Sequence, residues 1–284
     1  MTLTESSFVS TADGMSISTF AWTDVETPVG AVQLAHGLAE HSARYSRLAE
    51  ALNQAGYLVF SVDHRGHGRT GQAHLGDFGS AGFDGLIADV VQFGEWIAGE
   101  YPDLPLFLIA HSMGSFAAQS VLLERSDLYA GVVLSGSTAL DVLAAGLAQS
   151  EGPAGLEAFN AGFEPRTGYE WLSRDEAEVD LYVADPWCGF ETPPETIPML
   201  FARAGDVASP ASVRADLPLL IASGSDDPLA GGGELVALLA QRYRDAGLVD
   251  VTLTVYPQAR HEIFNEINRD EVTADVIAWL DAHR

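Results

Sequence analysis

The sequence predicts an α/β protein whose mostly parallel central sheet carries helices on both faces. Three observations indicate this class. Short apolar runs alternate with helix-length segments along most of the chain. One of these runs ends abruptly at a serine, and a helix-forming stretch follows at once. The chain has 284 residues, of which 47% are hydrophobic, so it is long enough to bury a full core.

The expected elements follow in chain order. An antiparallel hairpin at a sheet edge opens the chain, with strands at Phe8–Ser10 and Ser16–Trp22. Buried strands are expected at Ala31–Ala35, Tyr57–Val62, Leu106–Ala110, Gly131–Leu134, Leu217–Ser223 and Val251–Tyr256. Helices are expected from Ser42, as N-cap, to about Ala55, over Phe83–Tyr101, directly after Ser112, and over Glu234–Ala246 and Val272–His283.

The alternation of strands and helices breaks between residues 137 and 204. We therefore expect a core formed by residues 1–136 and 205–284, and a lid inserted at 137–204. A lid at this point lies above the carboxyl ends of the parallel strands, where open α/β sheets bind ligands.

Ser112 occupies the tetrapeptide His111-Ser112-Met113-Gly114, directly after an apolar strand. On a sharp strand-to-helix turn its hydroxyl points away from the backbone, and the amides of the new helix favour negative charge there. This pattern is typical of a nucleophile elbow, G-x-S-x-G, although Ala110 replaces the first glycine. The alternative is a serine that only caps a buried helix.

A serine nucleophile needs a base to accept its proton, and the base needs an acid to orient it. Of the eight histidines, His261 alone follows the serine in a loop after a late strand, in the required chain order. Asp226 and Asp227 follow the preceding late strand, and both remain candidates for the acid. The oxyanion of the intermediate needs amide donors, which we expect from the backbones of Met113 and Leu38.

Apolar side chains of the lid are the candidates for binding substrate. One expected helix presents Leu140, Leu143 and Leu147 on one face, and Trp187 and Phe190 lie further along the insertion. We expect these five side chains to line a tunnel above the serine. The alternative is that some of them form a small core of the lid itself.

Composition excludes several classes of partner. The chain has 40 acidic and 14 basic residues, all of the latter arginine, and its net charge of −26 repels nucleic acid and anionic lipid. No apolar run is long enough for stable insertion into a membrane, and no secretory signal is recognisable. The single cysteine, Cys188, excludes an internal disulfide and favours the cytoplasm. No metal-site or nucleotide motif is present, and the oligomeric state stays open.

The sequence resembles the monoacylglycerol lipase and lysophospholipase branch of the α/β-hydrolase superfamily, also called the serine aminopeptidase-like group. The blocks that carry the resemblance are His36–Tyr45, Asp63–Gly68, His111–Gly114, Leu172–Arg174, Gly224–Asp227 and His261. It implies an α/β-hydrolase fold with Ser112 as nucleophile and His261 as base. It also selects Asp227 over Asp226 as the acid.

The implied activity is that of a serine hydrolase that cleaves apolar carboxylic monoesters through an acyl-enzyme, without a cofactor. Three alternatives remain open. An aminopeptidase of the same group needs a lid carboxylate for the substrate amine, for which Glu151, Glu157 and Glu164 are candidates. An acyltransferase would differ in excluding water. A ligand-binding protein without activity would have lost part of the triad.

The charge excess generates a prediction about stability in salt. We attribute the excess mainly to solubility, with salt adaptation as the alternative. In both cases NaCl should raise the melting temperature, by about 2–4 °C for each kcal/mol of carboxylate repulsion that it screens. Differential scanning calorimetry from low to molar NaCl measures this. A melting temperature that stays flat or falls would contradict the prediction.

Overall fold

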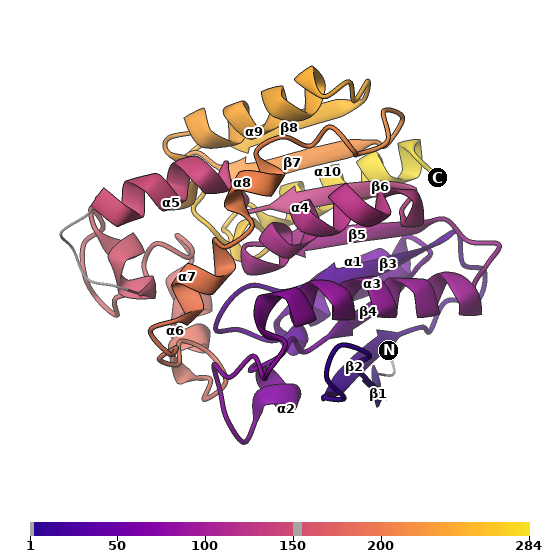
Figure 1. Cartoon of the computed structure of the whole chain (residues 1–284), viewed down its shortest axis with the longest axis horizontal. Coiled ribbons are helices and arrows are strands. Elements are labelled where there is room, and N and C mark those ends of the chain that lie inside the picture. Colours follow the sequence, from indigo (N-terminus) through magenta and orange to yellow (C-terminus); the bar gives the residue numbers. More distant parts are fainter. Residues whose placement is uncertain (1–2, 150–154) are drawn as a thin grey trace.

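The computed structural model describes residues 3–149 and 155–284. In this part of the chain eight strands form one sheet (Figure 1). Their order across the sheet is β1 (Leu3–Val9), β2 (Ser16–Trp22), β4 (Tyr57–Val62), β3 (Gly30–Ala35), β5 (Leu106–His111), β6 (Gly131–Ser135), β7 (Leu219–Gly224) and β8 (Val251–Tyr256). The pairs β1–β2 and β2–β4 are antiparallel, and the other pairs are parallel. The expected fold class is confirmed.

Five helices cover the two faces of the sheet (Figure 1). One face carries α3 (Gly82–Glu100), α4 (Met113–Arg125) and α9 (Glu234–Asp245), and the other carries α1 (Ser46–Gln54) and α10 (Arg269–Ala282). The other helices of the described ranges are α2 (Gly68–Gly71), α5 (Leu140–Gln149), α6 (Glu176–Ala184), α7 (Thr196–Leu200) and α8 (Ala204–Val207). The 3₁₀ turns are η1 (Ser42–Tyr45), η2 (Ser126–Leu128), η3 (Leu156–Asn160), η4 (Pro228–Ala230) and η5 (Ile263–Asn265).

The central strand β5 shows why its sequence is apolar throughout. Leu108 and Ala110 join the core beneath α3 and α4, whereas Phe107 and Ile109 join the core beneath α1 and α10. Alternate residues of a strand point to opposite faces, and both faces of this sheet are covered. A strand buried on both sides therefore has no polar face, and it ends directly at the turn that contains Ser112.

Two details of the expected elements are wrong. The first strand is longer than expected, because all seven residues of β1 pair with β2, from Leu3 opposite Trp22 to Val9 opposite Ser16. Ser42 does not cap a long helix. It begins the 3₁₀ turn η1, its hydroxyl bonds that of Ser61 at 2.9 Å, and α1 begins only at Ser46.

The chain between β6 and β7 forms a group of short helices rather than a further β-α repeat. It contains α5, η3, α6, α7 and α8, which lie together at one end of the sheet, on the left in Figure 1. The last of these, α8, packs against α4 and α5. The interval expected for the lid, 137–204, thus covers this group up to the first residue of α8.

Arg65, in the loop after β4, holds the N-terminal hairpin against α3. The side chain is completely buried, and its Nε donates to Asp89 Oδ2 at 2.6 Å. Its Nη1 donates to Asp13 Oδ2 at 2.7 Å and its Nη2 to Ser10 Oγ at 2.7 Å, both from the turn between β1 and β2. The guanidinium lowers the pKa of Asp13 to about 2. Removing this cation would leave the carboxylate of Asp89 buried without a charged partner.

We therefore expect Arg65→Met to lower the free energy of unfolding by about 3–5 kcal/mol, the usual result of removing one partner of a buried ion pair. Arg69→Met is the matched control, because Arg69 is 46% exposed and pairs with Glu5 at the surface. That control should cost about 0–1 kcal/mol. Urea denaturation measures both free energies of unfolding. Equal losses in the two variants would contradict the larger contribution that we assign to the buried network of Arg65.

Candidate active site

Ser112 forms the turn that joins β5 to α4. Its φ of 50° and ψ of −121° lie in a region that disfavours side chains, so the turn is strained. Its N–H donates to the carbonyl of Ser135 at 2.9 Å, which ties the turn to the end of β6. Within the described residues the Ser112 side chain makes no capping hydrogen bond to α4. The alternative of a simple helix cap is therefore wrong.

Two glycines let other segments approach this turn. A Cβ on Gly114 would lie 2.3 Å from the carbonyl oxygen of Ala35, and one on Gly37 would lie 3.1 Å from Cβ of Ser112. Only a residue without a side chain fits at Gly114, because the obstacle is backbone. Ala110, which replaces the usual elbow glycine, is fully buried in β5 and pairs in register with Ala35. The extra methyl group is thus accommodated within the sheet.

The loops after β7 and β8 bring Asp227 and His261 together. His261 Nδ1 lies 3.0 Å from Asp227 Oδ2, and both side chains are buried. The other oxygen of Asp227 accepts the N–H of Leu229 at 2.8 Å, which fixes the carboxylate. Asp226 is exposed and bonds only its neighbour Ser225 among the side chains described. The geometry therefore pairs His261 with Asp227 and not with Asp226.

Charges around His261 favour its protonated form. Burial on its own lowers the pKa of His261, but the carboxylates of Asp227, Glu262 and Glu40 outweigh burial and raise this pKa above its usual value. The ring of His111 packs against the ring of His261, with centroids 4.7 Å apart. Burial lowers the pKa of His111 to about 4, so this neighbour is neutral at pH 7.

A buried ionic cluster, Glu40-Arg44-Glu262, joins the loop after β3 to the loop of His261. Arg44 Nη1 donates to Glu40 Oε2 at 2.8 Å, and its two Nη atoms donate to Glu262 at 2.5 and 2.7 Å. Glu40 also accepts the N–H of Gly37 at 2.5 Å. Sequence reasoning missed this cluster because Arg44 and Glu262 are 218 residues apart, and the only signal was the position of Glu262 next to His261.

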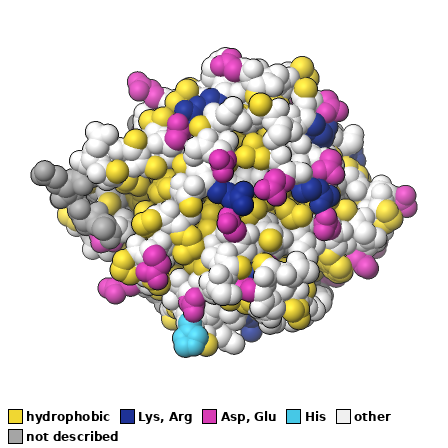
Figure 2. All heavy atoms as spheres, in the orientation of Figure 1, with side chains coloured by type: hydrophobic (Ala, Val, Ile, Leu, Met, Phe, Trp, Pro, Cys, Tyr) yellow, Lys and Arg dark blue, Asp and Glu magenta, His cyan; other side chains and the backbone are white. Residues whose placement is uncertain are grey.

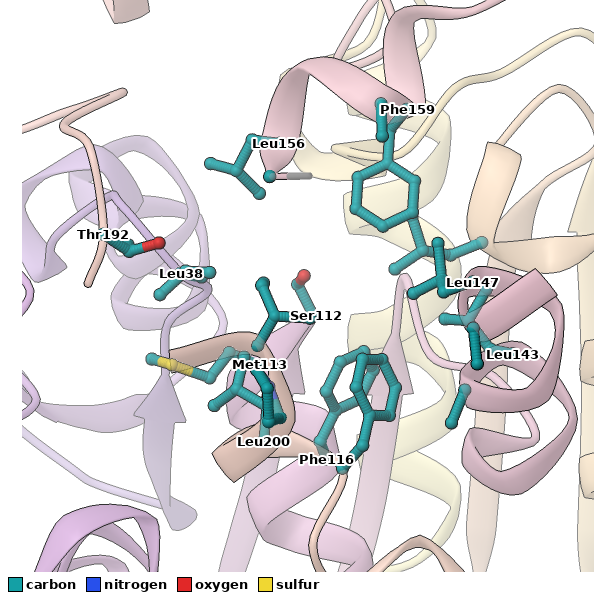
Figure 3. Close-up of a pocket in the computed structure, with 18 of the residues that line it drawn as sticks. Leu38, Ser112, Met113, Phe116, Leu143, Leu147, Leu156, Phe159, Thr192 and Leu200 are labelled. Atoms are coloured by element: carbon teal, nitrogen blue, oxygen red, sulfur yellow. The ribbon is translucent and has the colours of Figure 1, made fainter. Parts of the chain in front are cut away.

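A cavity of about 660 Å³ opens above Ser112. Figure 3 shows the serine hydroxyl pointing into it, with Leu156 and Phe159 on the opposite side. Its lining comprises Leu38, Ser112, Met113, Phe116, Leu143, Ala144, Leu147, Ala148, Gly155, Leu156, Ala158, Phe159, Trp171, Thr192, Pro193, Pro194, Ile197, Pro198, Leu200, Phe201 and Leu229. Among these described residues none carries a charge. Figure 2 shows apolar side chains gathered in the same region, between α5 and α7.

The structure brings some of the expected residues to this cavity and places others elsewhere. Leu38, Met113, Leu143 and Leu147 all belong to the lining. Three side chains expected in the substrate tunnel do not, and that expectation is wrong for them. Leu140 is buried in the main core beneath α5, Trp187 packs edge-on against His41 at 5.4 Å, and Phe190 packs against His67 at 5.3 Å.

One group of side chains offers donors of the kind that bind metal ions. Ligand atoms of His41, Asp185 and Cys188 lie within 4.8 Å of one another. His41 Nε2 already bonds Asp185 Oδ2 at 2.9 Å, and burial raises the pKa of the Cys188 thiol, which keeps it protonated. The arrangement therefore suits a link between the loop after β3 and the segment after α6 better than a cation site.

Comparison with known proteins identifies the family. Residues 26–268 match the model of the family described as serine aminopeptidase, S33. The chain belongs to this family. A monoacylglycerol lipase of Mycolicibacterium smegmatis is 32% identical over 95% of this chain and 94% of its own length. A monoglyceride lipase of Mus musculus is 30% identical over 96% of this chain and 89% of its own length.

Solved structures agree with this membership of the S33 family. A thermostable carboxyl esterase from Bacillus coagulans has a TM-score of 0.86 and 29% identity, and the match covers 100% of this chain and 99% of that one. A monoglyceride lipase variant from Saccharomyces cerevisiae has a TM-score of 0.75 and 25% identity, and the match covers 95% of this chain and 93% of that one. The chain is thus an α/β-hydrolase of the carboxylesterase and lipase type. No helix in the described ranges is long and apolar enough to cross a membrane.

Proposed function

We propose that this protein hydrolyses uncharged carboxylic monoesters with an apolar chain, of the monoacylglycerol kind. The observation that carries the proposal is the chargeless, apolar cavity directly above Ser112. The names of the relatives, monoacylglycerol lipase and monoglyceride lipase, point to the same substrate class. The lone, buried Cys188 suits a reducing compartment, and the cytoplasm is the location that we propose.

The proposed reaction proceeds through an acyl-enzyme. Ser112 Oγ attacks the ester carbonyl while His261 takes the hydroxyl proton, and Asp227 holds the imidazole in the required tautomer. The amides of Leu38 and Met113 stabilise the oxyanion, and collapse of the intermediate transfers the proton from His261 to the departing alcohol. Water, deprotonated by His261, then attacks the acyl carbon. The bond to Ser112 Oγ breaks, His261 returns the proton to this oxygen, and the acid is released.

Residues 137–204 act in this proposal as the lid that completes the cavity. Leu143 and Leu147 of α5 and Phe159 of η3 belong to its lining, as does Ile197 of α7. An apolar chain bound there loses its contact with water, and each buried methylene contributes about 0.8 kcal/mol. Part of the binding energy of the substrate would thus come from the insertion rather than from the sheet.

The family name raises the aminopeptidase alternative, and the lining of the cavity argues against it. A substrate amine in a dry cavity needs a carboxylate partner. Glu157 and Glu164, two of the candidates, are exposed and outside the described lining. Glu151, the third, lies outside the described residues. The proposal therefore keeps the ester as substrate.

The assignment of the acid generates a paired test. Asp227→Asn should reduce kcat by about 10⁴, because the imidazole of His261 loses the carboxylate that orients it. Asp226→Asn should leave kcat near that of the wild type, since Asp226 is exposed and does not bond His261. Ser112→Ala, which removes the nucleophile, should cost about 10⁴–10⁶. Initial rates on p-nitrophenyl butyrate measure all three, and a reversed order of the two aspartates would overturn the assignment.

The shape of the cavity predicts the preferred substrate. From acetyl to medium-chain esters, kcat/KM should rise by about fourfold per methylene while the chain fills the cavity. A series of p-nitrophenyl esters from acetyl to dodecanoyl measures this, with aminoacyl p-nitroanilides and phospholipids as comparison substrates. A maximum at acetyl would mean that no apolar chain is bound. Anilides cleaved faster than every ester would make the protein an aminopeptidase.

A further inference from the structure

Trp171 touches His261 with both its backbone and its side chain. The indole and imidazole centroids are 4.8 Å apart, with 38° between the planes. The carbonyl of Trp171 accepts the N–H of His261 at 3.2 Å. The tryptophan is 3% exposed and also belongs to the lining of the cavity above Ser112. One residue of the insertion therefore contacts both the histidine and the space for substrate.

Neighbouring side chains hold Trp171 in this position. The backbone N–H of Trp171 donates to Asn160 Oδ1 at 3.0 Å, and Asn160 Nδ2 donates in turn to the Glu170 carboxylate at 2.9 Å. The ring of Phe159 packs against the indole, with centroids 5.3 Å apart. The indole thus packs against both Phe159 of η3 and His261. Its position is set by contacts within the protein.

The indole N–H of Trp171 is not used for a hydrogen bond within the described residues. Trp171 Nε1 is buried and has no hydrogen-bond partner among the described residues. Buried tryptophan N–H groups usually have a partner, because an unpaired donor costs free energy. A smaller apolar side chain would avoid that cost. The contact of the indole ring with His261 is the interaction that a smaller side chain would lose.

The charges that surround His261 come from several elements. Asp227 lies at the start of η4, Glu262 is adjacent in the chain, and Glu40 belongs to the loop after β3. Arg44 bonds both glutamates and reduces their effect on the imidazole. His111, on β5, is neutral at pH 7. When His261 accepts a proton it therefore becomes a buried cation, for which an aromatic face is a favourable neighbour.

We propose that Trp171 is a positioning residue for His261, whose indole face holds the imidazole and stabilises the imidazolium formed during acyl transfer. This inference rests on the proposed role of His261 as the base. A cation over an indole is stabilised by the electron density of the ring face, and the effect grows when water is excluded. Trp171 thereby links the insertion to the base as well as to the substrate.

The pH dependence of kcat/KM tests this role, because its acid limb reports the pKa of the base in the free enzyme. Removing the ring by Trp171→Leu should move this limb to lower pH by about 0.5–1 unit and reduce kcat about three- to tenfold. Trp171→Phe retains an aromatic face, so its acid limb should stay close to that of the wild type and most of kcat should remain. Phe201→Leu is the matched control: Phe201 lines the same cavity and packs against Phe116 rather than Trp171, so KM should change while the limb stays in place.

A second set of variants separates the ring electrons from packing. Site-specific incorporation of mono-, di- and trifluorotryptophan at position 171 withdraws electrons from the ring face with almost no change in volume. The acid limb should move to lower pH with each fluorine. A limb that is unchanged in both the leucine variant and the fluorinated series overturns the inference, as does an equal shift in Phe201→Leu. Full activity of Ser112→Ala would instead overturn the proposed function, so the two failures are distinguishable.

Discussion

The strained turn at Ser112 is the constraint on which the arrangement of the site depends. A central strand must become a helix within one residue, and the backbone at Ser112 takes a positive φ to do so. The strain persists because the surroundings fix it: the Ser112 N–H is bound by β6, and backbone from the end of β3 packs against Gly114. The hydroxyl is thereby placed at the carboxyl edge of the sheet, beneath the insertion.

The buried ionic cluster Glu40-Arg44-Glu262 sets the relation between two loops that flank this turn. Glu40 holds the N–H of Gly37, next to the amide expected to bind the oxyanion, while Glu262 follows His261. A buried cation with two carboxylates is costly unless every partner is bonded, and here Tyr45 also donates to Glu40 at 2.7 Å. The same carboxylates favour a proton on His261. One cluster therefore acts on both the geometry and the charge of the site.

Local sequence signals predicted the sheet, the elbow and the pairing loop of His261, because each depends on residues close together in the chain. The side-chain packing of the insertion could be predicted only in part. Leu143 and Leu147 reach the cavity while Leu140, on the same helix, is buried in the core. Trp187 and Phe190 were as apolar as any lining residue, yet they pack on His41 and His67. Which face of a short helix meets the cavity is decided by tertiary packing, which hydrophobicity alone does not encode.

The arginines are paired away from the cavity and supply no cation to its described lining. All 14 have a partner: Arg244 and Arg260 donate to main-chain carbonyls, and the others pair with carboxylates. None of them belongs to the described lining of the cavity, and the chain has no lysine. An anionic head group would therefore meet a repelling surface and no cation inside. A neutral ester is not repelled by this charge, so the charge distribution favours the same substrate class that we propose from the apolar lining.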